Sequence, residues 1–352
     1  MARIRRKRSL QLMLLILLVI ALWQADRWVG VRLGPAAPGS TQSMTIVIPA
    51  GATTRTVGDL LASRHLIVDS TVFRYYTRLE GLEGTLKSGE YQLSPGMTLR
   101  QILDRLSRGE TVVHKFTIPE GTTVKQMADL LASQHVVDKQ QFLQAAAASK
   151  LNAQYLPPDV RLTEPLEGYL FPDTYDFKPG ITPDQVLQLM YNRWQQEWTP
   201  DRVAQAKAMG LSVHQAVTLA AIVEREARVA QERPVIAGVY LNRLQIGMKL
   251  DADPTVYYAV GKLQTQELTL EDLQSPSPYN TYRTNGLPPG PIAAPGAAST
   301  TAALHPAKHA YLYFVAKQDG TGEHYFAETL AEQSANIAKA AANAQATAAK
   351  AH

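Results

Sequence analysis

Residues 212–226 read Ser-Val-His-Gln-Ala-Val-Thr-Leu-Ala-Ala-Ile-Val-Glu-Arg-Glu and predict the helix around which the rest of the chain is organised. Ser212 followed by Gln215 forms a capping box, which marks a helix N-terminus. Apolar residues then recur at helical spacing as far as Val223. A helix turns by about 100° per residue, so Glu224 and Glu226 at its end point in different directions and only one of them can face a given cleft.

The two glutamates have different surroundings. Glu224 has Arg228 four residues on, which suits an exposed helical ion pair and a structural, supporting role. Glu226 is flanked at helical spacing by the apolar residues Ile222, Val223, Val229 and Ala230. These neighbours disfavour a charged carboxylate and predict a raised pKa for Glu226. A carboxyl that holds its proton near neutral pH can act as a general acid on a glycosidic oxygen, so Glu226 is the predicted catalytic residue. An ordinary tolerated glutamate is the alternative.

Composition and charge exclude several classes of function. The 352 residues are enough for two or three domains with their own cores. The formal net charge of +4 becomes −1 once the five basic residues before residue 9 are subtracted, so no nucleic-acid surface is indicated. The chain has no cysteine, which excludes disulfides and thiolate chemistry. His305 and His309 are four residues apart, but Pro306 lies between them and no His-Glu-x-x-His motif is present, so neither a metal nor a cofactor is predicted.

The N-terminus predicts a membrane anchor. Leu12–Trp23 is an unbroken run of 12 apolar residues that follows a basic cluster. This length also suits a signal peptide, but no clear cleavage site follows, and Trp23 and Trp28 suit a membrane interface. We therefore expect residues 1–30 to form a cytoplasmic basic tip and one uncleaved span, Leu10–Trp23, in the inner membrane, with the rest of the chain periplasmic by the positive-inside rule. Residues 31–43 are rich in glycine and proline and predict a linker.

Residues 44–150 contain an internal repeat with an offset of 70 residues. Ile48-Pro49-Ala50-Gly51 recurs as Ile118-Pro119-Glu120-Gly121, and the helical residues that follow, up to His65 and His135, recur as well. Each copy predicts a strand, a Pro-x-Gly turn and a helix. Such units resemble the LysM-like modules of cell-wall proteins. A small α+β domain duplicated without a sugar site is the alternative.

Residues 151–336 predict a further mixed domain, which makes the whole chain α+β. Helical patterns cover 182–198, 212–226, 234–245 and 253–260, and a hairpin is predicted from 311–316 and 324–326. Asp253 directly precedes a proline at the start of its helix, so we predict a helix-capping, supporting role for it rather than that of a second catalytic acid. Residues 275–296 predict a rigid irregular loop, which is either a binding surface or a connector. Residues 337–352 predict an alanine-rich tail, which is either a solvated helix or frayed.

Several ordered motifs resemble the YceG-like family of endolytic murein transglycosylases. The motifs are Glu167–Tyr175, Ala221–Glu226, Asn242–Leu244, Asp253–Val256, Tyr279–Tyr282, Gly286–Ile292, His305–Ala307 and Tyr311–Val315. The resemblance covers nearly the whole chain and implies an anchor, a LysM-like region and a catalytic domain. It also assigns the catalytic role to the second glutamate of the Glu-x-Glu pair, which is Glu226. The chain departs from the family at Gln333-Ser334, where a His-Asn pair is usual.

The resemblance implies the chemistry of a lytic transglycosylase. Such enzymes cleave the MurNAc-β-1,4-GlcNAc bond of peptidoglycan without water and leave a 1,6-anhydro ring. The C6 hydroxyl of the sugar is the nucleophile, so one glutamate can act first as acid and then as base. The second carboxylate of an ordinary glycosidase is not required. The family further implies action on nascent glycan strands as a terminase of elongation, with peptidoglycan synthases (penicillin-binding proteins) as partners.

Eight residues are predicted to bind the substrate. Asn280, Thr281 and Tyr282 are expected to face the positive charge that develops on the sugar. Tyr169, Phe171 and Tyr175 are expected to offer ring faces, with a place in the aromatic core as the alternative. Glu167 in the first motif and His324 on the predicted hairpin complete the set. The competing hypothesis is a non-catalytic, membrane-anchored protein that binds peptidoglycan, in which Glu226 is structural.

Overall fold

The computed structural model describes residues 27–112, 114–158, 160, 162 and 164–350, together with residues 13, 15–17, 19, 20, 23 and 24. Half of the predicted anchor, Leu10–Trp23, therefore lies outside the described residues. Among the described residues no single helix is long and apolar enough to cross a membrane. One strongly bent pair, α8 (Pro200–Ala208) with α9 (Val213–Glu226), reaches that length and hydropathy only when the two helices are taken together.

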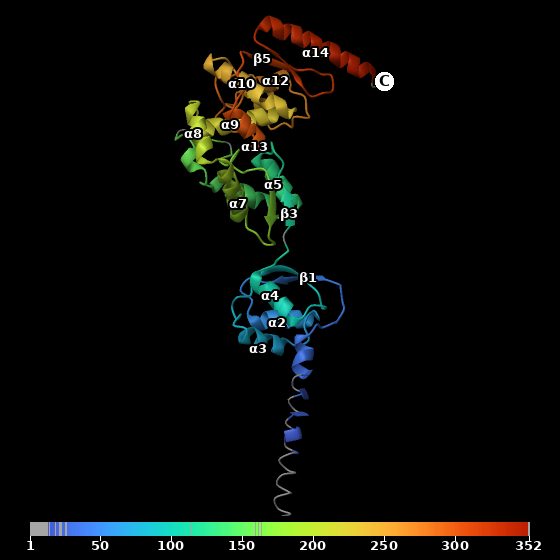
Figure 1. Cartoon of the computed structure of the whole chain (residues 1–352). Helices are drawn as coiled ribbons and strands as arrows, with labels where there is room; N and C mark the ends of the chain where they lie inside the picture. The colour runs from blue at the N-terminus through green and yellow to red at the C-terminus, as the bar shows by residue number, and fades with distance from the viewer. Residues whose placement is uncertain are drawn as a thin grey trace, which may run out of the picture. The chain divides into compact units, whose positions relative to one another are not determined.

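The chain divides into two compact units, whose elements are labelled in Figure 1. Unit 1 comprises Met1–His114 with Asp176–Gly180, and unit 2 comprises Lys115–Tyr175 with Ile181–His352. This division differs from the predicted one, in which residues 44–150 form one region and 151–336 another. The second copy of the repeat belongs to unit 2, because its strand and helices pack with elements that follow residue 150.

Unit 1 is built on a two-stranded antiparallel sheet. Its elements are β1 (Met44–Ile48), α2 (Thr54–Ser63), α3 (Ser70–Leu79), β2 (Gly89–Leu93) and α4 (Leu99–Arg108). Met44 pairs with Leu93 and Ile48 with Gly89. Alternate residues of both strands point into one core with the apolar faces of the three helices, as the two-residue period of a strand requires. Strand β2, the turn at Pro95-Gly96 and helix α4 follow the same order of strand, turn and helix as the two repeat copies.

Unit 2 is mostly helical. The elements that lie in it wholly or in part are β3 (His114–Thr117), α5 (Val124–Ser133), α6 (Lys139–Ala148), the 3₁₀ helix η1 (Ala153–Tyr155), β4 (Thr174–Phe177), α7 (Pro183–Glu197), α8, α9, the 3₁₀ helix η2 (Ala230–Glu232), α10 (Arg233–Gln245), α11 (Asp253–Val260), α12 (Leu270–Leu273), α13 (Ala297–Leu304), β5 (Tyr313–Ala316), β6 (His324–Ala327) and α14 (Leu330–Lys350). Strand β3 pairs with β4, and β5 pairs antiparallel with β6. The predicted α+β class and the predicted hairpin are confirmed.

The two copies of the repeat share their local geometry. Thr53 and Thr123 cap helices α2 and α5, and each hydroxyl accepts a hydrogen bond of 3.2 Å from the backbone N–H three residues on. His65 and His135 follow these helices in the left-handed region, with φ of 54° and 55°. Both histidines therefore lie just beyond a helix C-terminus, next to the positions predicted for them. The likeness of the copies to LysM modules stays a prediction.

The C-terminal helix α14 begins at Leu330, before the predicted tail, and is part of the fold. Three of its side chains bind backbone carbonyls of the β5–β6 hairpin and the turn that follows β5: Gln333 to Phe314, Asn336 to Phe326, and Asn343 to Lys317. The predicted segment is therefore helical from residue 337 to Lys350, which agrees with the helical alternative. Its contact with the residue after β5 through Asn343 was not predicted, since sequence periodicity in an alanine-rich segment does not reveal amide contacts of this kind.

Candidate active site

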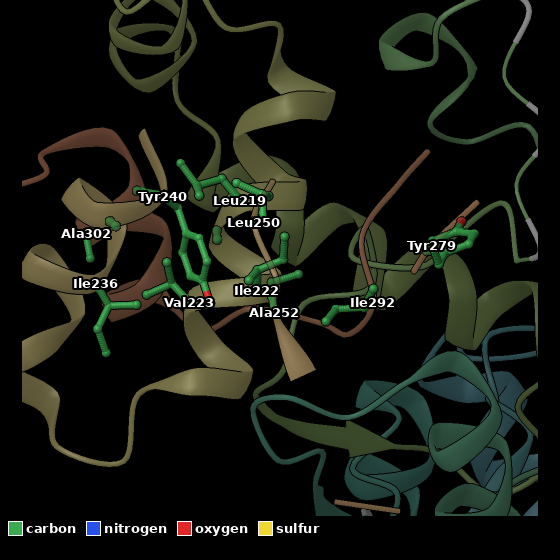
Figure 2. Close-up of a cluster of buried hydrophobic side chains, with 14 residues drawn as sticks. Leu219, Ile222, Val223, Ile236, Tyr240, Leu250, Ala252, Tyr279, Ile292 and Ala302 are labelled. Atoms are coloured by element: carbon green, nitrogen blue, oxygen red, sulfur yellow. The ribbon is translucent and has the colours of Figure 1, made fainter. Parts of the chain in front are cut away.

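Helix α9 carries the two glutamates from the core to the surface. Its residues from Ala216 to Val223 are all buried, and they share a core with α10 and α13. Figure 2 shows Tyr240 of α10 in this core, among Ile222, Val223 and Ile236. The helix ends at Glu226 with Ala227 as its C-terminal cap. The last turn of a buried helix therefore delivers its charged residues to the edge of the core.

A cleft of about 880 Å³ opens at this end of α9. Among the residues that line it are Glu226 and Glu224 of α9, Asp253 at the start of α11, Tyr282, His324 of β6, Arg243 of α10, and Glu120 with Gly121 from the second repeat. All of these residues belong to unit 2. The cleft is thus walled by segments that are far apart in the sequence but lie within one compact unit.

Glu226 is half-buried in the wall of this cleft. The hydroxyl of Tyr240 donates a hydrogen bond of 2.7 Å to its Oε1 atom. The pKa of Glu226 is raised to about 7, mainly by burial and also by the charge of Asp253, while the Tyr240 hydrogen bond and the charge of Arg243 lower it. The rise agrees with the direction predicted from the apolar helical neighbours. A carboxyl with this pKa is present in both protonation states near neutral pH.

The guanidinium of Arg243 is fixed close to this site by the backbone. Its Nε atom donates to the carbonyl of Leu312 and its Nη1 atom to that of Leu250, both at 2.6 Å. Arg243 is held by neutral carbonyls and forms no ion pair with a carboxylate among the described residues, so its positive charge is not cancelled by such a pair. It therefore remains available to stabilise negative charge on Glu226.

Glu224 differs from its prediction. Its carboxylate lies 3.5 Å from Arg233, not beside Arg228, and it also accepts a hydrogen bond of 3.0 Å from the backbone N–H of Gly296. Only 7% of the side chain is exposed. Gly296 precedes α13, so Glu224 ties the end of α9 to the start of α13 and to η2–α10. The supporting role agrees with the prediction, whereas the exposed i,i+4 pair is wrong.

Asp253 also differs from its prediction. Ala252 is the N-cap of α11, and no side chain caps this helix. The Asp253 carboxylate instead accepts a hydrogen bond of 2.6 Å from the hydroxyl of Tyr282 and lines the cleft. The prediction of a helix-capping role is therefore wrong. A capping residue has an extended backbone and precedes the first helical residue, and here that residue is Ala252, whereas Asp253 already lies in the helix. A second carboxylate stands in the cleft with Glu226.

The segment before Asp253 is held in a strained backbone conformation. Asp251 has φ of 44°, which is unfavourable for a residue with a side chain. Thr281 stabilises the segment by accepting a hydrogen bond of 3.0 Å from Ala252 N–H, and the Thr255 hydroxyl donates to the Ala252 carbonyl at 2.6 Å. Backbone strain of this kind persists where the surroundings fix it, and here it presents Asp251 and Asp253 to the cleft.

A model of the YceG-like family matches residues 46–339 of the chain. The chain belongs to the YceG-like family. Two relatives carry the name endolytic murein transglycosylase. The one from Bacillus subtilis is 35% identical over 314 residues, which are 85% of each chain. The one from Streptococcus pneumoniae is 30% identical over 332 residues, which are 87% of this chain and 60% of the relative.

A solved structure extends this similarity to the fold. The crystal structure of a YceG-like protein from Listeria monocytogenes, determined at 2.6 Å, is 36% identical to this chain. The match has a TM-score of 0.57 and covers 84% of this chain and 99% of the other. The mixed α+β fold described above is therefore the fold of the YceG-like family.

The aromatic residues of the first YceG-like motif lie in the core of unit 2. Tyr169 is fully buried, and Phe171 and Tyr175 are each 5% exposed. The Tyr169 hydroxyl donates to Nδ1 of His214 at 2.8 Å, because Nε2 of His214 donates to the carbonyl of Pro289 at 2.7 Å. The prediction that these rings stack on sugars is therefore wrong, and the alternative of an aromatic core is confirmed. The motif instead fixes α9 against the proline-rich loop.

Glu167 of the same motif lies outside the cleft. Its buried carboxyl accepts hydrogen bonds from the backbone N–H of Val124 at 3.1 Å and from the hydroxyl of Tyr258 at 3.3 Å. Burial raises the pKa of Glu167 to about 8. The prediction that it binds substrate is wrong, because it is enclosed where the start of α5 meets α11.

Asn280 and Thr281 are fully buried, so the prediction that they face the substrate is wrong as well. The Asn280 amide donates to the carbonyls of Leu273 and Ser275. Tyr282, the next residue, does line the cleft. His324 also lines it, with Nδ1 2.7 Å from a carboxylate oxygen of Glu232. Of the eight predicted binding residues, the structure brings Tyr282 and His324 to Glu226.

Sequence reasoning missed Tyr240, Arg243 and Glu120 as residues of the site. Tyr240 lies in α10, the next α-helix after Glu226. A tyrosine on an apolar helix face indicates a buried hydroxyl, which needs a hydrogen-bond partner. Arg243 lies in a YceG-like motif, but its sequence neighbours do not reveal its partners. Within the Ile-Pro-x-Gly turn, the two repeat copies differ at Glu120, since the first copy has Ala50 there.

Proposed function

We infer that the protein is a lytic transglycosylase that cleaves the MurNAc-β-1,4-GlcNAc bond of peptidoglycan within glycan strands and leaves 1,6-anhydroMurNAc ends. Membership of the YceG-like family and the names of the relatives support the reaction class. The observation that carries the assignment is Glu226, a half-buried carboxyl with a pKa of about 7 in the wall of the cleft. A group with these properties can both give and accept a proton near neutral pH.

The reaction uses one proton that Glu226 gives and then regains. Protonated Glu226 donates to the glycosidic oxygen as the bond from that oxygen to C1 of MurNAc breaks. The resulting carboxylate takes the proton of the C6 hydroxyl, whose oxygen forms the new bond to C1. Tyr240 orients the carboxyl through its 2.7 Å hydrogen bond and stabilises the charged intermediate state.

Asp253 has a supporting electrostatic role in this mechanism. Its carboxylate lines the cleft, and Tyr282 fixes it by a 2.6 Å hydrogen bond. A fixed negative charge stabilises the positive charge that develops at C1 in an oxocarbenium-like transition state. A second carboxylate in the cleft would also suit hydrolysis, in which water rather than the C6 hydroxyl attacks. The reaction products decide between these two functions.

The test is digestion of purified peptidoglycan by the full chain. We expect fragments with anhydro ends, which are lighter by one water than hydrolysed ends and are resolved by mass spectrometry. Glu226→Gln should lower their release by ~10²-fold to 10⁴-fold, the range for loss of general acid-base catalysis. Glu323→Gln is the matched control, because Glu323 lines the same cleft but pairs with Lys317. Water-added ends would contradict the transglycosylase assignment, and binding without any release would favour a non-catalytic wall-binding protein.

We further propose that the protein is anchored in the inner membrane by one N-terminal span, with its bulk in the periplasm. There it would end the elongation of nascent strands beside peptidoglycan synthases. The basic cluster before Leu12–Trp23 supports this orientation. Intact-mass measurement of the protein from the membrane fraction tests the anchor. A mature chain that begins after about residue 25 would contradict it.

A further inference from the structure

The turn of the second repeat is fixed into the wall of the cleft. The backbone N–H of Gly121 donates to the carbonyl of Ala294 at 2.8 Å, and Ala294 N–H donates to Thr122 at 3.0 Å. The guanidinium of Arg225 donates to the carbonyl of Gly121 at 2.8 Å. Arg225 directly precedes Glu226, so the turn is bound both to the end of α9 and to the segment before α13. The second repeat thus belongs to the active-site architecture.

The side chain of Glu120 projects from this turn as an exposed carboxylate that lines the cleft. Among the described residues, the Glu120 carboxylate has no hydrogen-bond or ion-pair partner. Partial burial and the nearby charge of Glu224 raise the pKa of Glu120, and these effects exceed the opposite effect of the Arg233 charge. A carboxylate without a bonded partner, placed near a second carboxylate, costs folding free energy. The stability of the fold therefore does not explain why this position is a glutamate.

The neighbouring backbone leaves room for the Glu120 carboxylate. A Cβ atom placed on Gly296 would overlap the Glu120 carboxylate, so the absence of a side chain at Gly296 leaves this position of the carboxylate open. The turn itself does not require glutamate. The first repeat has Ala50 at the equivalent position, and both turns depend instead on Gly51 and Gly121, with φ of 74° and 72°.

We propose that Glu120 is a substrate-binding residue whose carboxylate accepts hydrogen bonds from hydroxyl or acetamido N–H groups of a sugar ring in the cleft. This inference rests on the proposed function. Carboxylates outnumber arginines in the cleft as a whole, but two arginines lie next to the Glu120 turn: Arg225, which binds the carbonyl of Gly121, and Arg233. A neutral saccharide therefore fits beside Glu120 better than a cationic group of a stem peptide. The second repeat thereby contributes a residue to glycan recognition, and the first repeat, with Ala50, does not.

The test compares the full chain with its Glu120→Ala variant on glycan strands from which the stem peptides have been removed. A lost hydrogen bond to a charged group corresponds to roughly a tenfold to hundredfold weaker interaction. We therefore expect KM to rise about tenfold or more, with kcat and its pH dependence nearly unchanged. The thermal midpoint should not fall, since the repulsion from Glu224 is removed. Ala50→Glu in the first repeat is the matched control and should change none of these values.

Three outcomes would overturn the inference: an unchanged KM, a fall in kcat with a shifted pH profile, or an effect seen only on strands that carry stem peptides. The last would assign Glu120 to an ammonium group instead. Equilibrium binding separates this inference from the proposed function. Glu226→Gln protein should bind peptide-free strands about tenfold or more tightly than the Glu120→Ala, Glu226→Gln double variant. That difference would be present even if the wild type released no anhydro ends, a result that would overturn only the proposed function.

Discussion

The protonation of Glu226 depends on three neighbouring side chains whose effects have different signs. The Asp253 charge raises the pKa of Glu226, whereas the Tyr240 hydrogen bond and the Arg243 charge lower it. The acid form is needed for the first step, so activity should decline as pH rises through about 7. Each neighbour can be removed singly, which makes the pH profile a test of the site's electrostatics.

We predict that Asp253→Asn shifts the high-pH limb of kcat to lower pH. Loss of the negative charge makes ionisation of Glu226 easier, so the acid form is exhausted at a lower pH. The rate at the optimum should also fall, because the transition-state charge loses a stabilising carboxylate. The measurement is kcat between about pH 5 and 9, the range around the Glu226 pKa. A limb that stays in place would show that Asp253 does not act on Glu226.

We predict the opposite shift for Tyr240→Phe. The phenol hydrogen bond stabilises the carboxylate form, so its removal raises the pKa of Glu226 and extends the acid form to higher pH. The maximum rate should be lower, because the carboxyl loses the bond that orients it. Shifts of opposite sign in the two variants cannot arise from general destabilisation. A shift of Tyr240→Phe to lower pH would contradict this account of the site.

For single residues, the sequence predicts a property correctly where that property depends on residues nearby in the chain. Val223 and Ile222 lie within one helical turn of Glu226, so the direction of its pKa shift could be read from the chain. The partner of Glu224 could not, because Arg233 comes after the helix end and an intervening 3₁₀ turn. Asp253 was assigned from a capping pattern, but its position in the cleft is set by Tyr282, 29 residues away.

At the scale of elements, Glu167 connects α5 of the second repeat with α11 of the cleft wall. Its pKa is raised from 4.5 to about 8, so the folded protein keeps a proton that the unfolded chain loses above about pH 4.5. The native state therefore binds more protons than the unfolded state between these values, and the stability contributed by this proton decreases as pH rises from about 4.5 to about 8.

We predict that Glu167→Gln removes part of this pH dependence. Glutamine can still accept the Val124 hydrogen bond but does not titrate, so the variant should lose less stability between about pH 4.5 and 8 than the wild type. Glu226 remains in both proteins, which means that the difference between them isolates Glu167. Denaturant unfolding at several pH values measures it. Parallel stability curves would contradict the assignment of a buried, protonated Glu167.

The same scale shows which elements could be predicted. The capping box at Ser212 and Gln215, the left-handed Gly261 at the end of α11, and the β5–β6 hairpin all follow from local sequence. The motif around Tyr169 was misread because its aromatic rings suit either a sugar or a core. Its burial depends on α7 and His214, and such distant packing has no local signal.

At the scale of the whole molecule, the second repeat copy is part of unit 2. We predict that a protein beginning at Lys115 unfolds cooperatively, whereas one beginning at Leu151 has a lower thermal midpoint or no cooperative transition. The shorter protein lacks β3, which pairs with β4. It also lacks Val124, whose backbone N–H donates a hydrogen bond to Glu167. It also lacks the Gly121 backbone bonds to Ala294. Thermal unfolding followed by circular dichroism compares the two. Equal midpoints would restore the domain boundary expected near residue 150.

The stacked pair of Trp194 and Trp198 has an optical consequence. Their rings lie 5.6 Å apart in the buried cluster at the end of α7, and the only other tryptophans of the chain are Trp23 and Trp28. Between residues 29 and 193 there is no indole at all. The tryptophan fluorescence of a protein that begins at Lys115 therefore originates from this one pair. Its emission and near-ultraviolet dichroism would report the unfolding of unit 2 without any attached label.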